Sequence, residues 1–280
     1  VRVTGSELVG LIPLEAMLLA GKHYLIKQNR TLGIPEKDII ECAVQTLGLN
    51  DVTKFNASEK IIEYAIDNNN LGLMDHSCKD LVSLISNSSP APGGGSVAAI
   101  AGSLGAALVS MVAALTYEKK EFFSSRKLMN EIGVSAQKLK LRLIKLVDED
   151  TKAFDSILSA NRLPQKTSVQ KKYKEKKIIQ ANNYAIEIPL ETAKLSLEVI
   201  KLSTKLIECG NPNSVTDAEV AAEVGLAGVR GGCMNVMINL SGFDNPSINN
   251  SDMKTKINSI IDEANELHQK AFKDTINIIN

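Results

Sequence analysis

The chain has 280 residues, of which 44% are hydrophobic, and its 32 basic and 32 acidic side chains give a formal net charge of zero. This length supplies enough apolar material for a buried core in one large domain or two modest ones. The balanced charge argues against nucleic acid and charged membrane surfaces as partners. The absence of Trp, with only 4% aromatic residues, argues against an aromatic stacking platform for single strands.

The first 65 residues are predicted to be a small, incomplete α/β segment. Residues 1–4 and 7–12 are rich in apolar and β-branched side chains, with Gly5 between them, which is typical of strands. One or two strands do not make a stable sheet. We therefore expect this segment to be a piece of a fold.

Two helices and a linker follow the predicted strands. Pro13 opens an apolar-periodic helix over residues 14–24, because proline is tolerated in the first turn. A second helix is predicted over residues 36–47, and Gly48 ends it. The polar, asparagine-rich residues 66–72 are the predicted linker.

Residues 73–280 show no convincing strand pattern and are predicted to form an antiparallel helical bundle, so the fold class is mainly all-α. Pro189 is expected to interrupt one helix and restart it. The predicted caps are Asp75 or Ser77, Ser214 or Thr216, and Ser251. The predicted helices cover residues 77–85, 96–117, 126–161, 168–187, 189–209, 216–240 and 251–278.

One stretch of this bundle has the length of a membrane span. Residues 81–116 contain no ionisable side chain, and residues 95–116 are long enough to cross a bilayer. The apolar residues are mostly Ala, mixed with Gly and Ser, which contribute little transfer free energy. We therefore predict an enclosed central helix, hydrophobic all round, and no membrane as partner.

Four cysteines, Cys42, Cys78, Cys209 and Cys233, are widely separated. No pair has the spacing of a metal or redox motif, and no secretory signal is recognisable. We expect free thiols, a cytoplasmic location and no metal. Because the sequence starts at Val1 in ordered-looking material, we expect a C-terminal part of a longer polypeptide.

A glycine-rich turn precedes the central helix and reads PAPGGGS over residues 90–96. Its prolines stiffen the approach, and its three glycines remove every Cβ where the chain turns inward. Backbone N–H groups at the helix start are then free to face an anion or a polar ring edge. Taken alone, such a turn is more often only a tight loop, and it lacks the lysine of a nucleotide loop.

The string PAPGGGSVAA over residues 90–99 resembles the signature of the formimidoyltransferase-cyclodeaminase family, whose relatives include methenyltetrahydrofolate cyclohydrolases. The resemblance covers all of residues 73–280. Residues 1–14 resemble the end of the formiminotransferase C-terminal subdomain, so we assign residues 1–65 to a fragment of it. The segments that extend the match lie at residues 105–117, 146–154, 162–164, 188–190, 209–211 and 235–240.

The resemblance implies an ammonia-lyase reaction in histidine degradation and one-carbon metabolism. In it, 5-formiminotetrahydrofolate closes to 5,10-methenyltetrahydrofolate and releases ammonia. The glutamate formiminotransferase activity of multifunctional family members depends on a catalytic histidine outside this sequence, and we expect it to be absent. His23, His76 and His268 are expected to be surface or packing residues. No cofactor beyond the tetrahydrofolate substrate is expected.

The family's catalytic aspartate maps onto Asp150. One carboxylate within hydrogen-bond reach can take a proton from the attacking nitrogen and give one to the departing amine. Asp148, two residues away on the same helix, points roughly 200° apart from it, so we expect Asp148 to be solvent-facing or paired. The apolar neighbours of Asp150 predict partial burial and a raised pKa.

The candidate substrate-binding residues come from three regions. Asn235 and Asn239 share one helix face and suit the donor–acceptor pattern of a pterin, although an inter-helix clamp is equally consistent with them. Asp217 could also stabilise its own helix start. Two lysines could receive the carboxylates of a folate tail, which can be polyglutamylated. The set is Pro92, Gly93, Gly94, Gly95, Ser96, Asn235, Asn239, Asp217, Lys119 and Lys120.

Two other functions stay open at this point. Within the same fold, a methenyltetrahydrofolate cyclohydrolase would have water attack the methenyl carbon. A helical assembly module with a dead site is the alternative from another class, and the retained Asp150 and glycine turn argue against it. The resemblance also implies a homo-oligomer built from dimers.

Overall fold

The computed structural model describes residues 6–67, 72–242 and 249–280. Within these ranges the secondary structure is almost entirely helical, and the predicted all-α bundle is confirmed. The helices of the bundle are α5 (Cys78–Ile85), α6 (Gly94–Glu118), α7 (Arg126–Asn161), α8 (Ser168–Cys209), α9 (Val215–Gly242) and α10 (Asn250–Ile279), with short 3₁₀ turns at Leu73–Asp75, Lys120–Ser125 and Pro212–Ser214.

The N-terminal segment is helical rather than α/β in the part that the structure describes. It contains α1 (Leu14–Lys27), α2 (Glu36–Leu47), α3 (Ala57–Lys60) and α4 (Ile62–Asp67). The strand predicted over residues 7–12 is wrong, because the only ladder partner there is one parallel bridge between Ile12 and Ile61. The strand predicted over residues 1–4 and most of the linker lie outside the described residues.

The two predicted helices of this segment are confirmed. α1 begins directly after Pro13 and runs one turn further than expected. α2 has the predicted bounds, and Gly48 ends it in the left-handed conformation with φ 66°. Met17, Ile40, Val44 and Ile61 form the small apolar core between them.

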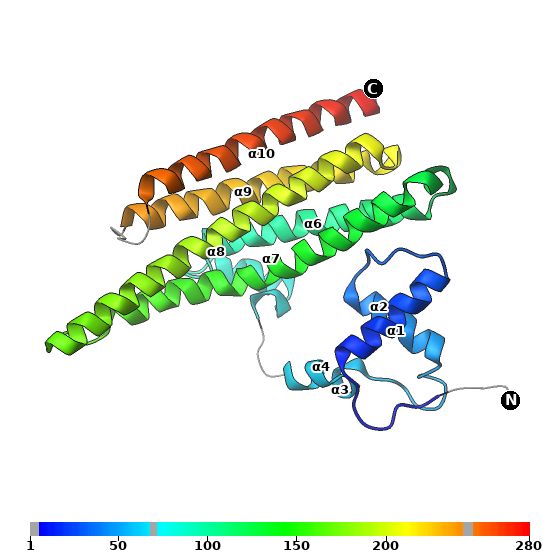
Figure 1. Cartoon of the computed structure of the whole chain (residues 1–280), viewed down its shortest axis with the longest axis horizontal. Coiled ribbons are helices and arrows are strands. Elements are labelled where there is room, and N and C mark those ends of the chain that lie inside the picture. The colour runs from blue at the N-terminus through cyan, green and yellow to red at the C-terminus, as the bar shows by residue number, and fades with distance from the viewer. Residues whose placement is uncertain (1–5, 68–71, 243–248) are drawn as a thin grey trace.

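The bundle is built around α6, which packs against α7, α8 and α9. α10 lies on the outside against α8 and α9. α7 and α8 form a long antiparallel hairpin that extends beyond the other helices at one end, and the N-terminal segment lies beside α7 (Figure 1). One large cluster of buried side chains from α6 to α10 makes the core.

α6 is long and apolar enough to span a membrane by length and composition, and 56% of its most apolar window is buried. It occupies the predicted central position, but it is not enclosed on all sides. Val97, Leu104, Met111 and Leu115 are exposed along it. The prediction of a helix that is buried all round is therefore wrong on this face.

α8 runs unbroken through Pro189, so the predicted interruption is wrong. Proline has no N–H to donate to the carbonyl four residues earlier. That carbonyl, on Ala185, instead accepts a hydrogen bond from Nδ2 of Asn239 at 2.6 Å. The neighbouring helix thus replaces the missing donor. Gly232 lets α9 come this close, because a Cβ there would lie 2.7 Å from the Pro189 carbonyl oxygen.

The helix caps agree with the predictions in part. Ser77 caps α5 through the backbone N–H of Asp80, as expected. The last helix is capped by Asn249, whose side chain accepts from Ser251 and Asp252, rather than by Ser251 itself. Thr167 begins α8 with a capping box that includes Gln170.

Candidate active site

Three consecutive carboxylates on α7 point to three different partners. Asp148 accepts a hydrogen bond from the backbone N–H of Leu73 at 2.8 Å. Glu149 forms a bidentate pair with Arg142, at 2.6 and 2.9 Å. Asp150 faces the start of α6. The expectation that Asp148 is paired rather than facing the same substrate agrees with this arrangement.

Asp150 caps α6 from the neighbouring helix. Gly93 occupies the N-cap position of α6 and has no side chain with which to cap it. The hydroxyl of Ser96 lies 2.9 Å from Oδ2 of Asp150 and 3.1 Å from the carbonyl oxygen of Val147. The backbone N–H of Ser96 also donates to the Asp150 carboxylate. A carboxylate at a helix N-terminus is stabilised by the unpaired N–H groups and by the helix dipole.

The contact requires glycine at position 95. A Cβ built on Gly95 would overlap the carboxylate of Asp150. Gly95 is buried within the first turn of α6. The glycine turn therefore does more than permit helix packing, since it lets a carboxylate reach the helix start.

The electrostatics of Asp150 combine two opposing effects. Burial raises the pKa of its carboxyl above the ordinary value, while the hydrogen bonds from the Ser96 side chain and backbone lower it. The net direction is upward, as the sequence predicts. A carboxylate of this kind is suited to exchange protons closer to neutral pH than a surface aspartate.

A cavity of about 120 Å³ opens beside Asp150. It is walled on one side by the glycine turn, on a second by α7 and on a third by α8 and α9. The polar groups among its walls are Asp150 and two amides, Asn235 and Asn239. The remaining lining residues are Pro90, Ala91, Gly93, Gly94, Gly95, Ala153, Phe154, Ile157 and Ala185.

The two asparagines both bond to backbone and both line the cavity. Asn239 donates to Ala185 on α8, as described above. Asn235 donates to the carbonyl of Gly231 within its own helix at 2.8 Å, and its Nδ2 lies 3.6 Å from the position of a Cβ on Gly94. The inter-helix clamp is thus present at Asn239, and contact of either amide with a ligand stays a prediction.

The structure does not bring every predicted site residue to this cavity. Pro92 lies within the turn but does not line the cavity. Lys119 and Lys120 follow the far end of α6, and the helical rise puts Lys119 roughly 36 Å from Gly95. Asp217 lies in the first turn of α9, roughly 27 Å from Asn235. The length of the helices separates these three residues from Asp150.

Sequence reasoning missed several walls of the cavity. Phe154 and Ile157 follow Asp150 by four and seven residues, so helical spacing alone places them on the same face. Ala185 carries no local signal, because it reaches the site only through the packing of α8 against α9. Pro90 and Ala91 belong to the turn that the sequence did single out.

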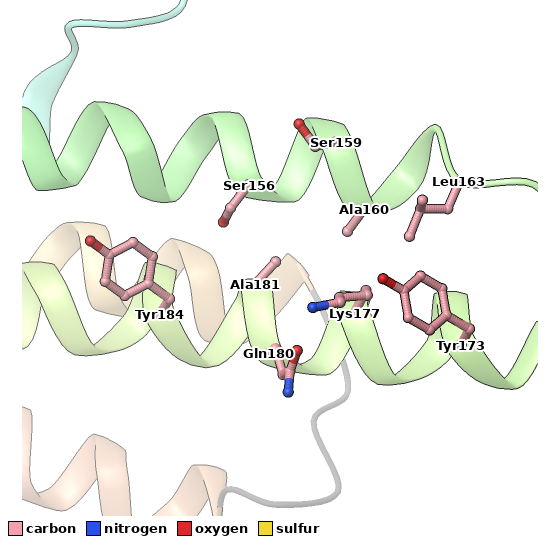
Figure 2. A pocket seen from close by; sticks show the side chains of 9 residues that line it. All are labelled: Ser156, Ser159, Ala160, Leu163, Tyr173, Lys177, Gln180, Ala181 and Tyr184. Carbon is pink, nitrogen blue, oxygen red and sulfur yellow. The ribbon is translucent and has the colours of Figure 1, made fainter.

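A larger cavity of about 430 Å³ lies between the last turns of α7 and the first half of α8. Figure 2 shows Tyr173, Lys177 and Tyr184 of α8 opposite Ser156 of α7 and Leu163, which follows the end of α7. Nζ of Lys177 lies 5.7 Å from the centre of the Tyr173 ring. No carboxylate lines this cavity. Because its lining has no carboxylate comparable to Asp150, the smaller cavity is the candidate active site.

Fold and site together define a helical-bundle protein with a carboxylate placed for acid–base chemistry. Family models identify it further: residues 77–263 match the formiminotransferase-cyclodeaminase model, and residues 1–67 match the formiminotransferase domain. The chain therefore belongs to the formiminotransferase-cyclodeaminase family.

Curated relatives agree with this assignment. Formimidoyltransferase-cyclodeaminase of Rattus norvegicus is 33% identical over 264 residues, which is 94% of this chain and 48% of the relative. The chain thus spans about half the length of such relatives. Methenyltetrahydrofolate cyclohydrolase of Methylorubrum extorquens is 33% identical over 196 residues, 70% of this chain and 94% of the relative.

A solved structure shows the same fold. The crystal structure of formiminotetrahydrofolate cyclodeaminase from Thermotoga maritima superposes with a TM-score of 0.63 and 22% sequence identity. The match covers 75% of this chain and all of the Thermotoga maritima chain.

Proposed function

We propose that this chain is a formiminotetrahydrofolate cyclodeaminase, which closes 5-formiminotetrahydrofolate to 5,10-methenyltetrahydrofolate and releases ammonia. The observation that carries the proposal is the half-buried Asp150, held at the start of α6 by Ser96 and facing a cavity with two amides. The names of its relatives and of the structural neighbour support the same reaction.

Asp150 would move one proton in two steps. The nitrogen that bridges the pterin to the benzoyl group attacks the carbon of the protonated formimino group and becomes positively charged, which leaves an amine on that carbon. The Asp150 carboxylate takes the proton from that nitrogen, and the carboxylic acid then gives it to the amine of the tetrahedral intermediate. The carbon–nitrogen bond to this amine breaks, ammonia leaves, and the carboxylate is restored. The reaction as written needs no cofactor beyond the folate itself.

The size of the cavity limits how the substrate binds. Pockets for complete small ligands measure about 300–1,000 Å³, whereas the space beside Asp150 measures about 120 Å³. We infer that the formimino group and the adjacent ring edge enter it. The benzoylglutamate tail would lie outside this space, and Lys119 and Lys120 of the same chain lie too far along α6 to receive it.

The activity is tested on the purified chain with 5-formiminotetrahydrofolate. Ammonia release and methenyl absorbance are followed together. Asp150→Asn should lower the rate by about 10²–10⁴-fold, the usual contribution of an acid–base group. Asp155→Asn, on an exposed part of the same helix, is the matched control and should leave the rate unchanged. A folded Asp150→Asn variant with the original rate would disprove the role.

Methenyltetrahydrofolate cyclohydrolase is the second candidate. The observation in its favour is the match to a relative of that name, of which this chain covers 94%. In that reaction Asp150 would activate water instead of a folate nitrogen. Incubation with 5,10-methenyltetrahydrofolate separates the two: a cyclodeaminase leaves the methenyl absorbance nearly constant, and a cyclohydrolase removes it.

We also infer that the protein works as a homo-oligomer built from dimers. The exposed residues Val97, Leu104, Met111 and Leu115 recur at intervals of seven and four along α6, which places them on one helix face. A second copy of the chain is the occupant we expect there. Light scattering after gel filtration tests this, and a monomer at micromolar concentration would contradict it.

We also propose a cytoplasmic location, because four unpaired cysteines suit a reducing compartment.

A further inference from the structure

A second cluster of polar side chains lies where α10 crosses α9, outside the candidate active site. Glu219 and Glu223 are one turn apart on α9, and His268 faces them from α10. One ligating atom from each of the three lies within 4.8 Å of the other two. The cluster is roughly 24 Å along α9 from Asn235, from the helical rise, so the proposed folate chemistry does not use it.

The buried part of this cluster is not satisfied by the protein. Glu219 is 8% exposed, and among the described residues its Oε1 has no hydrogen-bond partner. Its Oε2 is 3.4 Å from the hydroxyl of Thr275. A carboxylate oxygen that is buried without a donor is costly, and native structures have few of them.

The histidine is also incompletely satisfied. Nε2 of His268 lies 2.9 Å from Oε1 of Glu223, but the nitrogen is buried and the contact lacks hydrogen-bond geometry. The Glu223 side chain is 52% exposed and the His268 side chain 18%. The cluster thus has one deep carboxylate, one half-buried imidazole and one carboxylate that is open to solvent.

We propose that Glu219, Glu223 and His268 bind a divalent transition-metal ion, with Zn²⁺ as the best match, and that this ion fastens α10 to α9. Two carboxylates balance the charge of a divalent cation, and neutral imidazole is a common ligand beside them. Metal–ligand distances of about 2.1 Å allow ligands up to about 4.2 Å apart. The three ligating atoms lie within 4.8 Å of one another, so a shift of less than about 1 Å would bring them within this limit, and water would complete the coordination.

The competing explanation is an ion pair without metal. In it, a protonated His268 lies between the two glutamates, and Glu219 holds or loses a proton according to pH. Burial is the main cause that raises the pKa of Glu219, and the charge of His268 opposes it. This arrangement binds no cation, so direct binding measurements separate the two explanations.

The experiment titrates Zn²⁺ into the full chain by calorimetry after treatment with a chelator. We expect one ion per chain and a higher melting temperature in its presence. His268→Gln and Glu223→Gln should each weaken binding by at least about tenfold, since even outer-shell partners change metal affinity by 10–100-fold. Glu223 is exposed, so its variant tests the site without burying a new group. His76→Gln, at an exposed histidine, should bind like the unmodified chain.

Co²⁺ gives a second readout that identifies the ligands. Its visible absorption should match oxygen and nitrogen ligands and should disappear in His268→Gln. A sulfur-to-metal charge-transfer band would place the ion on a cysteine, such as the exposed Cys78, and would overturn the proposal. Absence of stoichiometric binding, or equal binding by Glu223→Gln and His76→Gln, would also overturn it and favour the ion pair.

Discussion

Asp150 serves both the fold and the proposed chemistry, because the same carboxylate that caps α6 faces the cavity. Its charged form is favoured by Ser96 and opposed by burial. An unperturbed aspartate has a pKa of about 3.9, and the pKa of Asp150 lies above its ordinary value. Because the carboxylate form must accept the proton, the rate should fall as pH drops through this raised pKa.

The Ser96 hydroxyl should set the position of that fall. Ser96→Ala removes one of the two hydrogen bonds that lower the pKa of Asp150 and leaves the backbone bond in place. The pKa of Asp150 then rises further, so the acid limb of kcat/KM moves to higher pH. Ser103→Ala on the same helix, whose hydroxyl donates to the carbonyl of Ile100, should leave the limb in place. A limb that stays fixed or moves to lower pH in Ser96→Ala would contradict this account.

Asp150 should also reduce the stability of the fold at neutral pH. Since its pKa is higher in the folded state than in the unfolded chain, the folded state binds the proton more tightly. The free energy of unfolding therefore falls as pH rises through that pKa. Asp150→Asn removes the buried charge, and we expect its melting temperature to equal or exceed that of the parent at pH 7.

Thermal unfolding at several pH values tests the sign. The advantage of Asp150→Asn over the parent should shrink as pH falls from above the raised pKa of Asp150 towards the ordinary aspartate pKa of about 3.9, and should level off below it, where both states are protonated. An advantage that grows in acid would show that the charged form stabilises the fold.

At the scale of the helices, the extensive contact between α8 and α9 includes one substituted hydrogen bond. Pro189 cannot donate to the buried Ala185, and Asn239 does so from α9. Asn239→Leu should leave that carbonyl unsatisfied and lower the free energy of unfolding by about 1–3 kcal/mol. Pro189→Ala restores the N–H, so Asn239→Leu should cost less in that background.

A double-mutant cycle by chemical denaturation measures this coupling. Asn213→Leu serves as a control. Asn213 lies just before α9, and its backbone N–H donates to the Asn211 side chain. This substitution should lower the free energy of unfolding by the same amount with and without Pro189. If Asn239→Leu lowered the free energy of unfolding equally in both backgrounds, the Asn239 amide would not be replacing the hydrogen bond that Pro189 cannot donate.

Prediction from the sequence succeeded for some helices and failed for other elements. The bounds of α2 and α7 agree with the predicted residues 36–47 and 126–161, because local periodicity and end signals determine them. The break at Pro189 was wrong because its compensation comes from a residue 50 positions later. The strand at residues 7–12 was wrong because propensity was not matched by ladder partners.

The sequence likewise predicted some parts of the candidate site and missed others. The glycine turn and Asp150 are 54 residues apart at the Ser96 contact, and the sequence named both ends without showing that they touch. Helical spacing could have added Phe154 and Ile157. The amide of Asn239 was predicted for the site, but its bond to Ala185 depends on tertiary packing.

At the scale of the whole molecule, residues 6–67 contact the bundle through the loop before α2, where the Ser110 hydroxyl of α6 donates to the Gly33 carbonyl at 3.0 Å. The backbone of Gly33 lies against Gly133 of α7, where a Cβ on Gly33 would come within 2.5 Å of the Gly133 Cα. Oδ1 of Asn130 accepts from the Leu32 N–H at 2.7 Å and from the Thr31 hydroxyl at 3.0 Å. This contact is about 25 Å along α7 from Asp150.

Asn130→Ala should therefore release the N-terminal segment without disturbing the bundle. The variant leaves the Leu32 N–H without its acceptor, at a cost of about 1–3 kcal/mol, which weakens the hold of the segment on α7. We expect faster hydrogen exchange and proteolysis in α1 and α2 and unchanged exchange in α6 to α9. Asn161→Ala, at the exposed end of α7, should change neither. Because Asp150 is held within the bundle, the proposed cyclodeaminase rate should persist in Asn130→Ala, and a parallel loss of rate would show that the segment supports the site through α7.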